Sequence, residues 1–440
     1  MAEPSPAHLS SVDAAAWPGV ATVPQPRGLA GGSLHVKRAE AGFARACAKA
    51  GLSLDGPERD LTVERSELFA RIAASGWVGL AEGYMAREWE TGSSQQLVDV
   101  LTALIRADYR PRAPRVVAQK RAEGGELPPD LVALFSGDGM SAFQGHFATG
   151  VATTERLREK SHTPGAGKGG EPAHHFVDAT SIGAPLASDR PDLGDAQRRS
   201  AEMLLAAVGV GPGAHVLEYP CQGGALAMQA NAAGATVDAA VRDELSRRAV
   251  LERFVVGGVD ASIRLDVAAG GAAEFARQRA GVYDAVVSME VLEALPVAGQ
   301  VRYLEAVDVL LAPAGRAGLQ TVVRTDAFSA TADRALDSLR AYVWPGLHYA
   351  APEELARAVD RSTNLRIVER TSAPEHLGAS LRLQRMVFDS HLREAAADGY
   401  DAVFRRLWTW QFALREALAR LGMIDVSQMV LARRSRRGRR

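Results

Sequence analysis

One strand–turn–helix segment, residues 216–227, constrains the fold of this chain more than any other part of its sequence. The mainly apolar residues 214–217 predict a buried strand, and the alanine-rich residues after the turn predict a helix. Glycine in such a turn lets the backbone approach a bound ligand closely, because it has no Cβ. The segment is typical of the opening βα unit of a nucleotide-type fold. Two positions where a small residue is expected hold Pro220 and Gln222, which raises the question of whether the turn still binds a ligand.

The chain after residue 195 alternates between predicted strands and helices. Strands are predicted at 215–218, 236–241, 262–267, 283–288 and 316–323, and helices at 196–208, 224–233, 244–254 and 300–311. Strands and helices that alternate at this interval predict an α/β fold with a doubly wound, mostly parallel sheet. The right-handed crossover rule then brings the ends of the first, second and fourth strands to one cleft. Further helices at 352–359, 381–396 and 400–421 and a closing strand at 424–432 follow.

Composition places few limits on function. The 440 residues are enough for two or three domains, and 47% hydrophobic with 23% charged residues is ordinary for a globular protein. The formal net charge of −1 gives no reason to expect a nucleic-acid partner. No apolar run reaches the roughly 20 residues that span a bilayer, and the N-terminus lacks a secretion signal. Cys47 and Cys221 are the only cysteines, which suits a reducing cytoplasm and gives no disulfide framework.

Changes in composition along the chain suggest five parts. Pro, Gly and Ser concentrate near the N-terminus and again before the α/β region, and arginine dominates the last residues. We expect a flexible tail at 1–35, a small N-terminal domain at 36–110, a linker at 111–172, the α/β domain at 173–433 and a basic tail at 434–440. Within the linker, short helices are expected at 129–135 and around 153–160.

Several motifs follow one another in an order known from one enzyme family. They are the glycine-punctuated 77–89 with its Tyr-Met-x-x-x-Trp pattern, the loop 216–227, the strand and turn 283–293, the segments 311–316 and 342–346 with Gln320 between them, and the C-terminal 399–408 and 428–433. Together they resemble the cyclopropane-fatty-acyl-phospholipid synthase and mycolic-acid cyclopropane synthase family. The resemblance covers about residues 60–110 and 173–433 and implies a Rossmann-like class I methyltransferase that uses S-adenosylmethionine (SAM).

The resemblance also implies cofactor-binding residues in the loop. Glu218 falls on the acidic position at the end of the first strand, and Gly223 and Gly224 remain from the family's glycines. Pro220 removes an N–H donor, and Gln222 puts a side chain where the methionine part of SAM would lie. A packed turn that binds nothing is an equally good interpretation of this loop.

Three further positions carry implied contacts to SAM. Asp243, or its neighbour Glu244, would hydrogen-bond the ribose hydroxyls, although either would also serve as the N-cap of the next helix. Asp266 matches the residue that holds the adenine amino group, and a solvent-exposed turn aspartate is the alternative. Phe176 would stack on the cofactor, but it lacks the hydroxyl of the family's tyrosine.

Glu293 and Gln320 are the implied catalytic residues. In the family, the glutamate helps hold a bicarbonate that acts as general base, because transfer to a double bond passes through a carbocation that must lose a proton. Gln320 stands where many members have a histidine. The alternative for Glu293 is a helix-start residue that faces solvent.

The remainder of the bicarbonate site departs from the family pattern. The histidine next to the glutamate is Ala294, a tyrosine position aligns with Leu377 beside His376, and the family's Tyr-Ser-Cys stretch finds no counterpart after His174-His175. Those two adjacent histidines do not predict a metal site, because neighbouring side chains rarely converge on one ion.

By resemblance, the chain transfers a methyl or methylene group to the double bond of an unsaturated phospholipid acyl chain. Methylation without ring closure would need less of the bicarbonate site. The alternative is a catalytically impaired member, a pseudoenzyme, that acts as partner or scaffold of an active lipid-modifying enzyme, because the departures gather at the site. A homodimer or a heteromer with an active paralogue fits either case. Each arginine of the tail would contribute roughly 1 kcal/mol at an anionic lipid surface, so we expect a cytoplasmic protein, peripheral on the inner face of the membrane.

Overall fold

The computed structural model describes residues 7–24, 31–54, 56, 58–114, 127–168, 171–268 and 271–434. The chain divides into two compact units. The first contains residues 1–122, 327–347 and 388–423, and the second contains residues 123–326, 348–387 and 424–440. In the described part of the chain, no helix is long and apolar enough to cross a bilayer.

The first unit is mainly helical. Its elements are η1 (Ala7–Leu9), α1 (Pro18–Ala21), α2 (Gly31–Ala50), β1 (Thr62–Val63), α3 (Glu67–Ser75), α4 (Trp77–Met85), β2 (Trp89–Glu90), α5 (Ser94–Arg106), α12 (Ala330–Ala335), α13 (Asp337–Tyr342), α16 (Leu392–Ala397) and α17 (Ala402–Arg420). Helix α17 packs against α4 and α5. All six tryptophans of the chain belong to this unit: Trp17, Trp77, Trp89, Trp344, Trp408 and Trp410.

The expectation of a flexible tail over residues 1–35 does not hold for residues 7–24. Leu9 and Val20 are 3% and 0% exposed and pack with Met85 and Leu407 in one apolar cluster. Burial of these side chains compensates for the low helix propensity of the surrounding Pro, Ser and Gly residues. The prediction for residues 1–6 and 25–30 lies outside the described residues.

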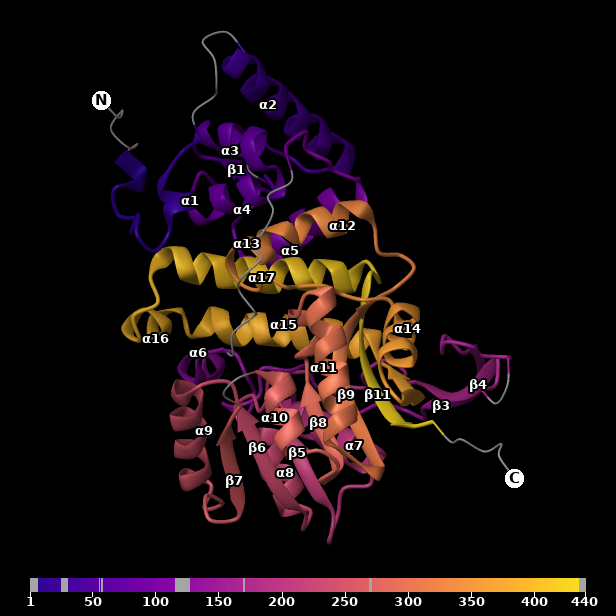
Figure 1. Cartoon of the computed structure of the whole chain (residues 1–440). Helices are drawn as coiled ribbons and strands as arrows, with labels where there is room; N and C mark the ends of the chain where they lie inside the picture. Colours follow the sequence, from indigo (N-terminus) through magenta and orange to yellow (C-terminus); the bar gives the residue numbers. More distant parts are fainter. Residues whose placement is uncertain are drawn as a thin grey trace. The chain divides into compact units, whose positions relative to one another are not determined.

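The second unit is built on a nine-stranded sheet (Figure 1). The strand order is β3-β4-β10-β11-β9-β8-β5-β6-β7. The strands are β3 (Thr153–Lys160), β4 (His174–Ser181), β5 (His215–Glu218), β6 (Thr236–Val241), β7 (Ile263–Val267), β8 (Tyr283–Met289), β9 (Leu311–Arg324), β10 (Leu365–Ser372) and β11 (Ile424–Arg433). Neighbours from β9 to β7 run parallel, β4 is parallel to β10, and β11 is antiparallel to both β9 and β10.

Helices cover both faces of this sheet. The helical elements of the unit are α6 (Pro129–Ala133), α7 (Asp192–Ala207), α8 (Ala225–Ala232), α9 (Glu244–Val256), α10 (Ala272–Gln278), η2 (Leu292–Ala294), α11 (Val297–Leu310), α14 (Pro352–Ser362) and α15 (Pro374–Ser390). One apolar cluster joins α7, α8 and α9 to the sheet, and a second joins α10, α11 and α14 to it. Val216 and Leu217, adjacent in β5, belong to different clusters, because side chains alternate between the faces of a strand. The arrangement confirms the predicted doubly wound, mostly parallel α/β sheet.

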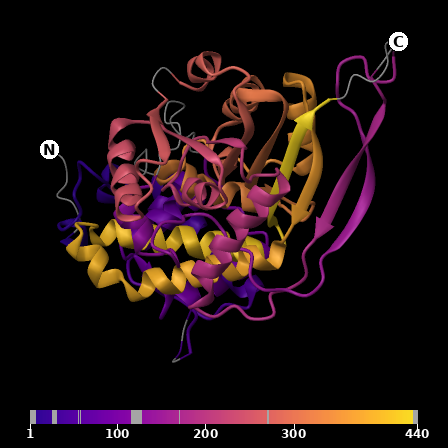
Figure 2. The same cartoon turned by 90° about the horizontal axis from the view of Figure 1, so that it is seen from below.

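The segment around residues 153–160 differs from the expectation of a short helix. It forms β3, which pairs antiparallel with β4 from Thr153↔Ser181 to Lys160↔His174. Figure 2 shows this magenta hairpin at the edge of the sheet, beyond β11. The sequence Thr-Thr-Glu-Arg-Leu-Arg-Glu-Lys has good helix formers, but pairing with a distant strand overrides local propensity. Part of the predicted linker is therefore sheet.

Candidate functional site

A pocket lies at the carboxyl ends of the parallel strands, where doubly wound sheets bind their ligands. Its cavity of about 310 Å³ is lined by residues that follow β5, β6, β7 and β8 and by residues of α10 and α11. The residues are Tyr219, Pro220, Val241, Arg242, Ala268, Gly271, Ala272, Ala273, Val291, Leu295, Gly299, Arg302 and Tyr303. The meeting of the first, second and fourth strand ends in one cleft is thus as predicted.

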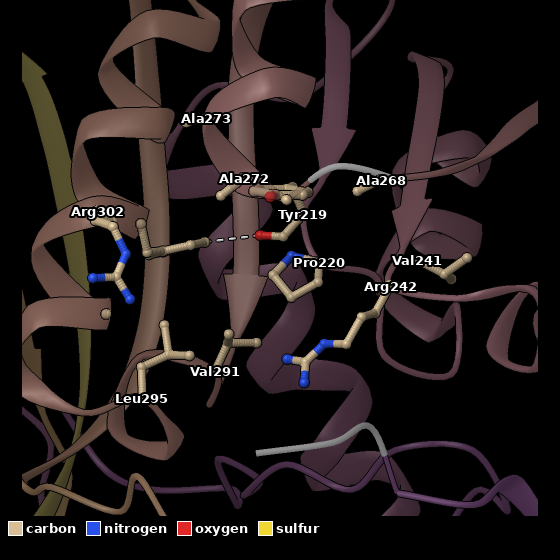
Figure 3. Close-up of a pocket in the computed structure, with 13 residues that line it drawn as sticks. Tyr219, Pro220, Val241, Arg242, Ala268, Ala272, Ala273, Val291, Leu295 and Arg302 are labelled. Atoms are coloured by element: carbon tan, nitrogen blue, oxygen red, sulfur yellow. Dashed lines mark hydrogen bonds between the residues drawn. The ribbon is translucent and has the colours of Figure 1, made fainter. Parts of the chain in front are cut away.

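Aromatic rings form one wall of this pocket. The Tyr219 ring stacks on Phe275 with centroids 5.1 Å apart and planes 8° apart, and on Tyr303 at 6.0 Å and 17°. The Tyr303 hydroxyl lies 2.8 Å from the carbonyl oxygen of Tyr219, a contact drawn in Figure 3. Burial raises the pKa of Tyr303 well above its usual range, so the hydroxyl stays neutral. This wall suits a flat, uncharged ring system.

Two arginines supply the charged groups among the lining residues, Arg242 after β6 and Arg302 on α11. In the view of Figure 3, the Arg302 guanidinium lies to the left of Leu295 and Val291, and that of Arg242 to their right. Guanidinium groups donate hydrogen bonds and accept none. The pocket therefore offers apolar walls with donors for hydroxyl, phosphate or carboxylate oxygens.

The loop between β5 and α8 is held by its own acidic residue. The Glu218 carboxylate, 3% exposed, accepts hydrogen bonds from the backbone N–H groups of Gln222 at 3.3 Å and Ala227 at 2.9 Å. Pro220 lines the pocket, whereas Gln222 does not. Glu218 thus fixes the turn that shapes the pocket.

Both predicted loop glycines adopt left-handed backbone conformations, with φ +73° at Gly223 and +82° at Gly224. A Cβ on Gly223 would come within 2.6 Å of both Met140 O and an Arg253 side-chain nitrogen. A Cβ on Gly224 would meet the Phe254 ring at 2.6 Å. The close approach that requires these glycines is to the protein's own atoms.

The other predicted cofactor contacts lie outside the pocket lining. Asp243 is the exposed N-cap of α9 and accepts from the Ser246 N–H at 2.8 Å, which lowers the pKa of its carboxyl. Asp266 forms ion pairs with Arg279 at 2.7 Å and Arg264 at 3.0 Å. These carboxylates have structural partners, and Arg242 stands in the pocket beside Asp243.

The structure places Phe176 away from the pocket. Phe176 lies on β4, 56% exposed, with the Arg156 guanidinium 5.1 Å from its ring centroid. Five strands separate β4 from β6 in the sheet order. Stacking on a ligand in the pocket would require a different position for this hairpin.

The side chains of Glu293 and Gln320 lie on opposite faces of β9: Gln320 belongs to the strand, and Glu293 contacts it from η2. The Glu293 carboxylate accepts from Thr321 Oγ1 at 2.6 Å and from the Val322 N–H at 3.2 Å, and burial together with the Glu290 charge raises its pKa to about 8. Gln320 is the neighbour of Thr321 in the strand, so its side chain faces the other way. The structure does not bring the two predicted catalytic side chains together. The use of bicarbonate at this site stays a prediction.

Gln320 instead joins a buried polar cluster that the sequence interpretation did not find. Its Nε2 donates to Glu290 at 3.0 Å and to the carbonyl oxygen of Gln144 at 2.9 Å. Its Oε1 accepts from Ser200 Oγ at 2.7 Å and from Gln428 Nε2 at 2.9 Å. We call Gln144, Ser200, Glu290, Gln320 and Gln428 the Glu290 cluster.

Segment 141–147 brings Gln144 to this cluster, from before the β3–β4 hairpin. None of the motifs named in the sequence falls on residues 141–147. The preceding helix at 129–135 was predicted and is present as α6. The one signal for Glu290 was its position directly after β8, since residues at carboxyl ends of parallel strands commonly line ligand sites.

His376, which contacts this segment, has a structural role. His376 Nδ1 accepts from the Phe147 N–H at 2.8 Å, and its Nε2 lies 2.8 Å from Gly183 O. Its neighbour Leu377 is 0% exposed. Across the described ranges, no group of three or more His, Cys, Asp or Glu side chains is arranged to hold a metal ion.

Comparison with known proteins identifies the family. The profile described as "Mycolic acid cyclopropane synthetase" matches residues 181–429, more than half of the chain. The chain belongs to this family. Membership confirms the family predicted from the motifs.

One curated relative is similar to most of this chain. The Tuberculostearic acid methyltransferase UfaA1 of Mycobacterium tuberculosis (strain ATCC 25618 / H37Rv) is 27% identical over 392 residues, which is 85% of this chain and 83% of the relative. Among solved structures, the cyclopropane synthase MmaA2 from Mycobacterium tuberculosis has a TM-score of 0.49 at 22% identity, covering 55% of this chain and 85% of that one. The mycolic acid cyclopropane synthase CmaA1, complexed with SAH and CTAB, has a TM-score of 0.48 at 19% identity, with the same coverage of both chains.

Proposed function

We propose that this chain is a SAM-dependent methyltransferase that modifies the double bond of an unsaturated acyl chain in a phospholipid. The observation that carries the proposal is the pocket at the carboxyl ends of β5, β6 and β7 in a member of the cyclopropane synthetase family. The relative similar over 85% of this chain is named as a methyltransferase, which favours a methyl-branched product over a cyclopropane.

The pocket residues fit SAM. Tyr219, Pro220 and Ala272 offer apolar surface to an adenine ring, and the cavity of about 310 Å³ lies in the range of small-molecule sites. Arg242 follows β6, where doubly wound sheets contact a ribose, and its guanidinium would donate to the ribose oxygens in place of an acidic acceptor. Arg302 would serve the same purpose for a second oxygen. SAM supplies an electrophilic methyl group on a positively charged sulfur.

The chain contributes position and exclusion of water around that methyl group. Val291 and Leu295 give the pocket an apolar floor beside the end of β8, which favours a hydrocarbon substrate. Glu218 holds the loop, so that Pro220 keeps its place in the wall.

The first experiment measures binding of SAM and S-adenosylhomocysteine to the whole protein by calorimetry. We expect micromolar affinity for the wild type and about tenfold weaker binding for Arg242→Ala, the loss of one charge-assisted hydrogen bond, about 1.4 kcal/mol. Arg248→Ala is the matched control, because Arg248 is an exposed arginine of α9 outside the pocket.

The second experiment follows a methyl-deuterated SAM into lipid by mass spectrometry, with vesicles of unsaturated phospholipid. Label in an acyl chain supports the proposal, and its mass separates a methyl-branched from a cyclopropane product. No SAM binding up to millimolar concentration would exclude the enzyme and leave the scaffold or partner of an active lipid-modifying enzyme.

A further inference from the structure

Glu290, the first residue after β8, has an unusual backbone. Its φ of +53° lies in the left-handed region, which it shares with two other non-glycine residues of the described chain, Arg87 and Asp108. That conformation costs roughly 1–2 kcal/mol for a residue with a Cβ. The Glu290 N–H nevertheless donates to Gln320 O at 2.7 Å, which continues the contact between β8 and β9. Strain that surrounding contacts maintain is typical of functional positions.

The contacts that hold this backbone converge on the Glu290 carboxylate. Its Oε1 accepts from the Gln144 backbone N–H at 2.6 Å and from Gln320 Nε2 at 3.0 Å, and its Oε2 lies 3.4 Å from Gln144 Nε2. Glutamine and backbone amides can stabilise a carboxylate without giving it a proton. The arrangement is a cradle of neutral donors around one carboxylate.

The orientation of Gln320 in this cradle is set by its neighbours. Ser200 Oγ and Gln428 Nε2 both donate to Gln320 Oε1, so the amide NH₂ must face Glu290. Gln144 Oε1, which is buried, has no hydrogen-bond partner among the described residues. The Glu290 cluster therefore contains a buried hydrogen-bond acceptor, Gln144 Oε1, that the contacts within the cluster leave unused.

The carboxylates of Glu290 and Glu293 differ in how accessible they are to a bound substrate. Glu290 is partly exposed, and the next residue, Val291, lines the pocket. Glu293 is 6% exposed and is engaged with β9 through Thr321 and Val322. A group that takes a proton from a substrate must reach it, and Glu290 meets this condition better than Glu293.

We propose that Glu290 is the proton acceptor of the methyl-transfer reaction and that Gln144 and Gln320 position it. The proposal rests on the proposed function. Transfer forms a carbon–carbon bond to one alkene carbon and leaves a positive charge on its neighbour, while the cofactor leaves as S-adenosylhomocysteine. The Glu290 carboxylate then removes a proton either from a chain carbon next to the cation, which leads to a double bond, or from the transferred methyl group, which leads to ring closure. The electron pair of that C–H bond forms a carbon–carbon double bond or closes a ring, and Glu290 later releases the proton to water.

The test uses Glu290→Gly, because glycine accepts the left-handed conformation and leaves the amide donors in place. Without SAM or lipid, we expect the variant to bind formate, a free carboxylate that fits the emptied cradle, as measured by calorimetry. Wild type and Glu202→Gln, an exposed carboxylate of α7, should bind none. Equal formate binding by all three proteins would contradict the inference that the amide donors around Glu290 form a carboxylate-binding site.

The catalytic role is tested with SAM and unsaturated phospholipid. We expect Glu290→Gly to lose at least about 100-fold in turnover, the size of a missing general base, and formate to restore at least tenfold. Glu290→Gln keeps the size of the side chain but accepts no proton; it should lose as much turnover while its SAM affinity stays within twofold of the wild type. Turnover of Glu290→Gln within threefold of the wild type would remove Glu290 from the reaction.

These outcomes separate the inference from the proposed function. If the wild type transfers no label to any acyl chain, the methyltransferase proposal fails, and the role of Glu290 fails with it. If the wild type is active and Glu290→Gln is equally active, only the role of Glu290 fails.

Discussion

Asp425 on β11 illustrates how burial of one carboxyl group couples proton binding to folding. Its side chain accepts from Ser372 Oγ at 2.5 Å and from the Ala373 N–H at 3.1 Å. Burial nevertheless raises the pKa of Asp425 from 3.8 to about 6. The cost of removing the ionised group from water therefore exceeds the gain from its hydrogen bonds.

The raised pKa gives a signed prediction for stability. The folded protein holds the Asp425 proton more tightly than the unfolded chain, so this contribution to stability is complete below pH 4 and is lost as pH rises through about 6. Asp425→Asn should be as stable as the wild type at pH 4 and more stable at pH 7.5, by up to about 3 kcal/mol. Urea unfolding followed by circular dichroism measures the difference. The control is Asp260→Asn, because Asp260 is exposed. If the free energy of unfolding had the same pH dependence in Asp425→Asn and in the wild type, the prediction would be wrong.

Residue roles at the site were harder to predict from sequence than the site's place. Position 218 at the end of β5 and the two loop glycines follow from the strand–turn–helix pattern. Glu290 did not, because a left-handed residue after a strand leaves no trace in hydrophobic periodicity. Its partner Gln144 is 146 residues away in the chain. Only the packing of a loop against two strand ends brings these side chains together.

At the scale of elements, the two glycines of the turn between β5 and α8 are closely packed against other parts of the chain. Gly224 combines φ +82° with a Phe254 ring that a Cβ would meet at 2.6 Å. Gly281, before β8, has a similar φ of +71° but nothing within 4 Å of such a Cβ. Alanine substitutions at Gly224 and Gly281 therefore separate the cost of backbone strain, which both share, from the cost of the steric clash with Phe254, which only Gly224 has.

We expect Gly224→Ala to destabilise the protein by roughly 3 kcal/mol, through strain and overpacking together. Gly281→Ala should cost roughly 1 kcal/mol, from strain alone. Urea unfolding gives both values, and SAM calorimetry on Gly224→Ala shows whether the pocket wall moves. The same loss of stability in both variants would mean that Phe254 shifts aside without cost.

Regular elements of the sheet were predictable because their pattern is local. Strands β5, β6, β7, β8, β9 and β11 and their connecting helices follow from alternating apolar runs. The β3–β4 hairpin could not be predicted in this way. The charged sequence of β3 favours a helix by propensity and becomes a strand only through pairing with residues 174–181. The N-terminal residues 7–24 were misjudged for the same reason: their order comes from burial of Leu9 and Val20 against distant residues.

At the scale of the whole molecule, 51 basic and 52 acidic residues nearly cancel, so attraction to an anionic membrane must be local. Six of the last eight residues are arginine. Arg433 is paired with Asp308 at 2.8 Å, and Arg434 donates to Asp360 O at 2.9 Å. These two are committed to the fold, whereas the remaining four lie outside the described residues.

We therefore predict that removal of residues 435–440 weakens binding to phosphatidylglycerol-rich vesicles at least tenfold at low salt. The expectation follows from roughly 1 kcal/mol per arginine near an anionic surface, reduced by screening. Cosedimentation measures it, and neutral phosphatidylcholine vesicles are the control. Unchanged binding after truncation would assign any membrane attraction to another surface.

The location of the tryptophans gives the first unit a fluorescence signal of its own. Because all six belong to the first unit, their fluorescence reports on that unit alone, whereas far-ultraviolet circular dichroism reports on the helices and strands of both units. Unfolding curves recorded by tryptophan fluorescence and by far-ultraviolet circular dichroism would coincide only if the two units unfold together. A ligand that enters the pocket and changes tryptophan emission would reveal communication between the units, without any label attached to the protein.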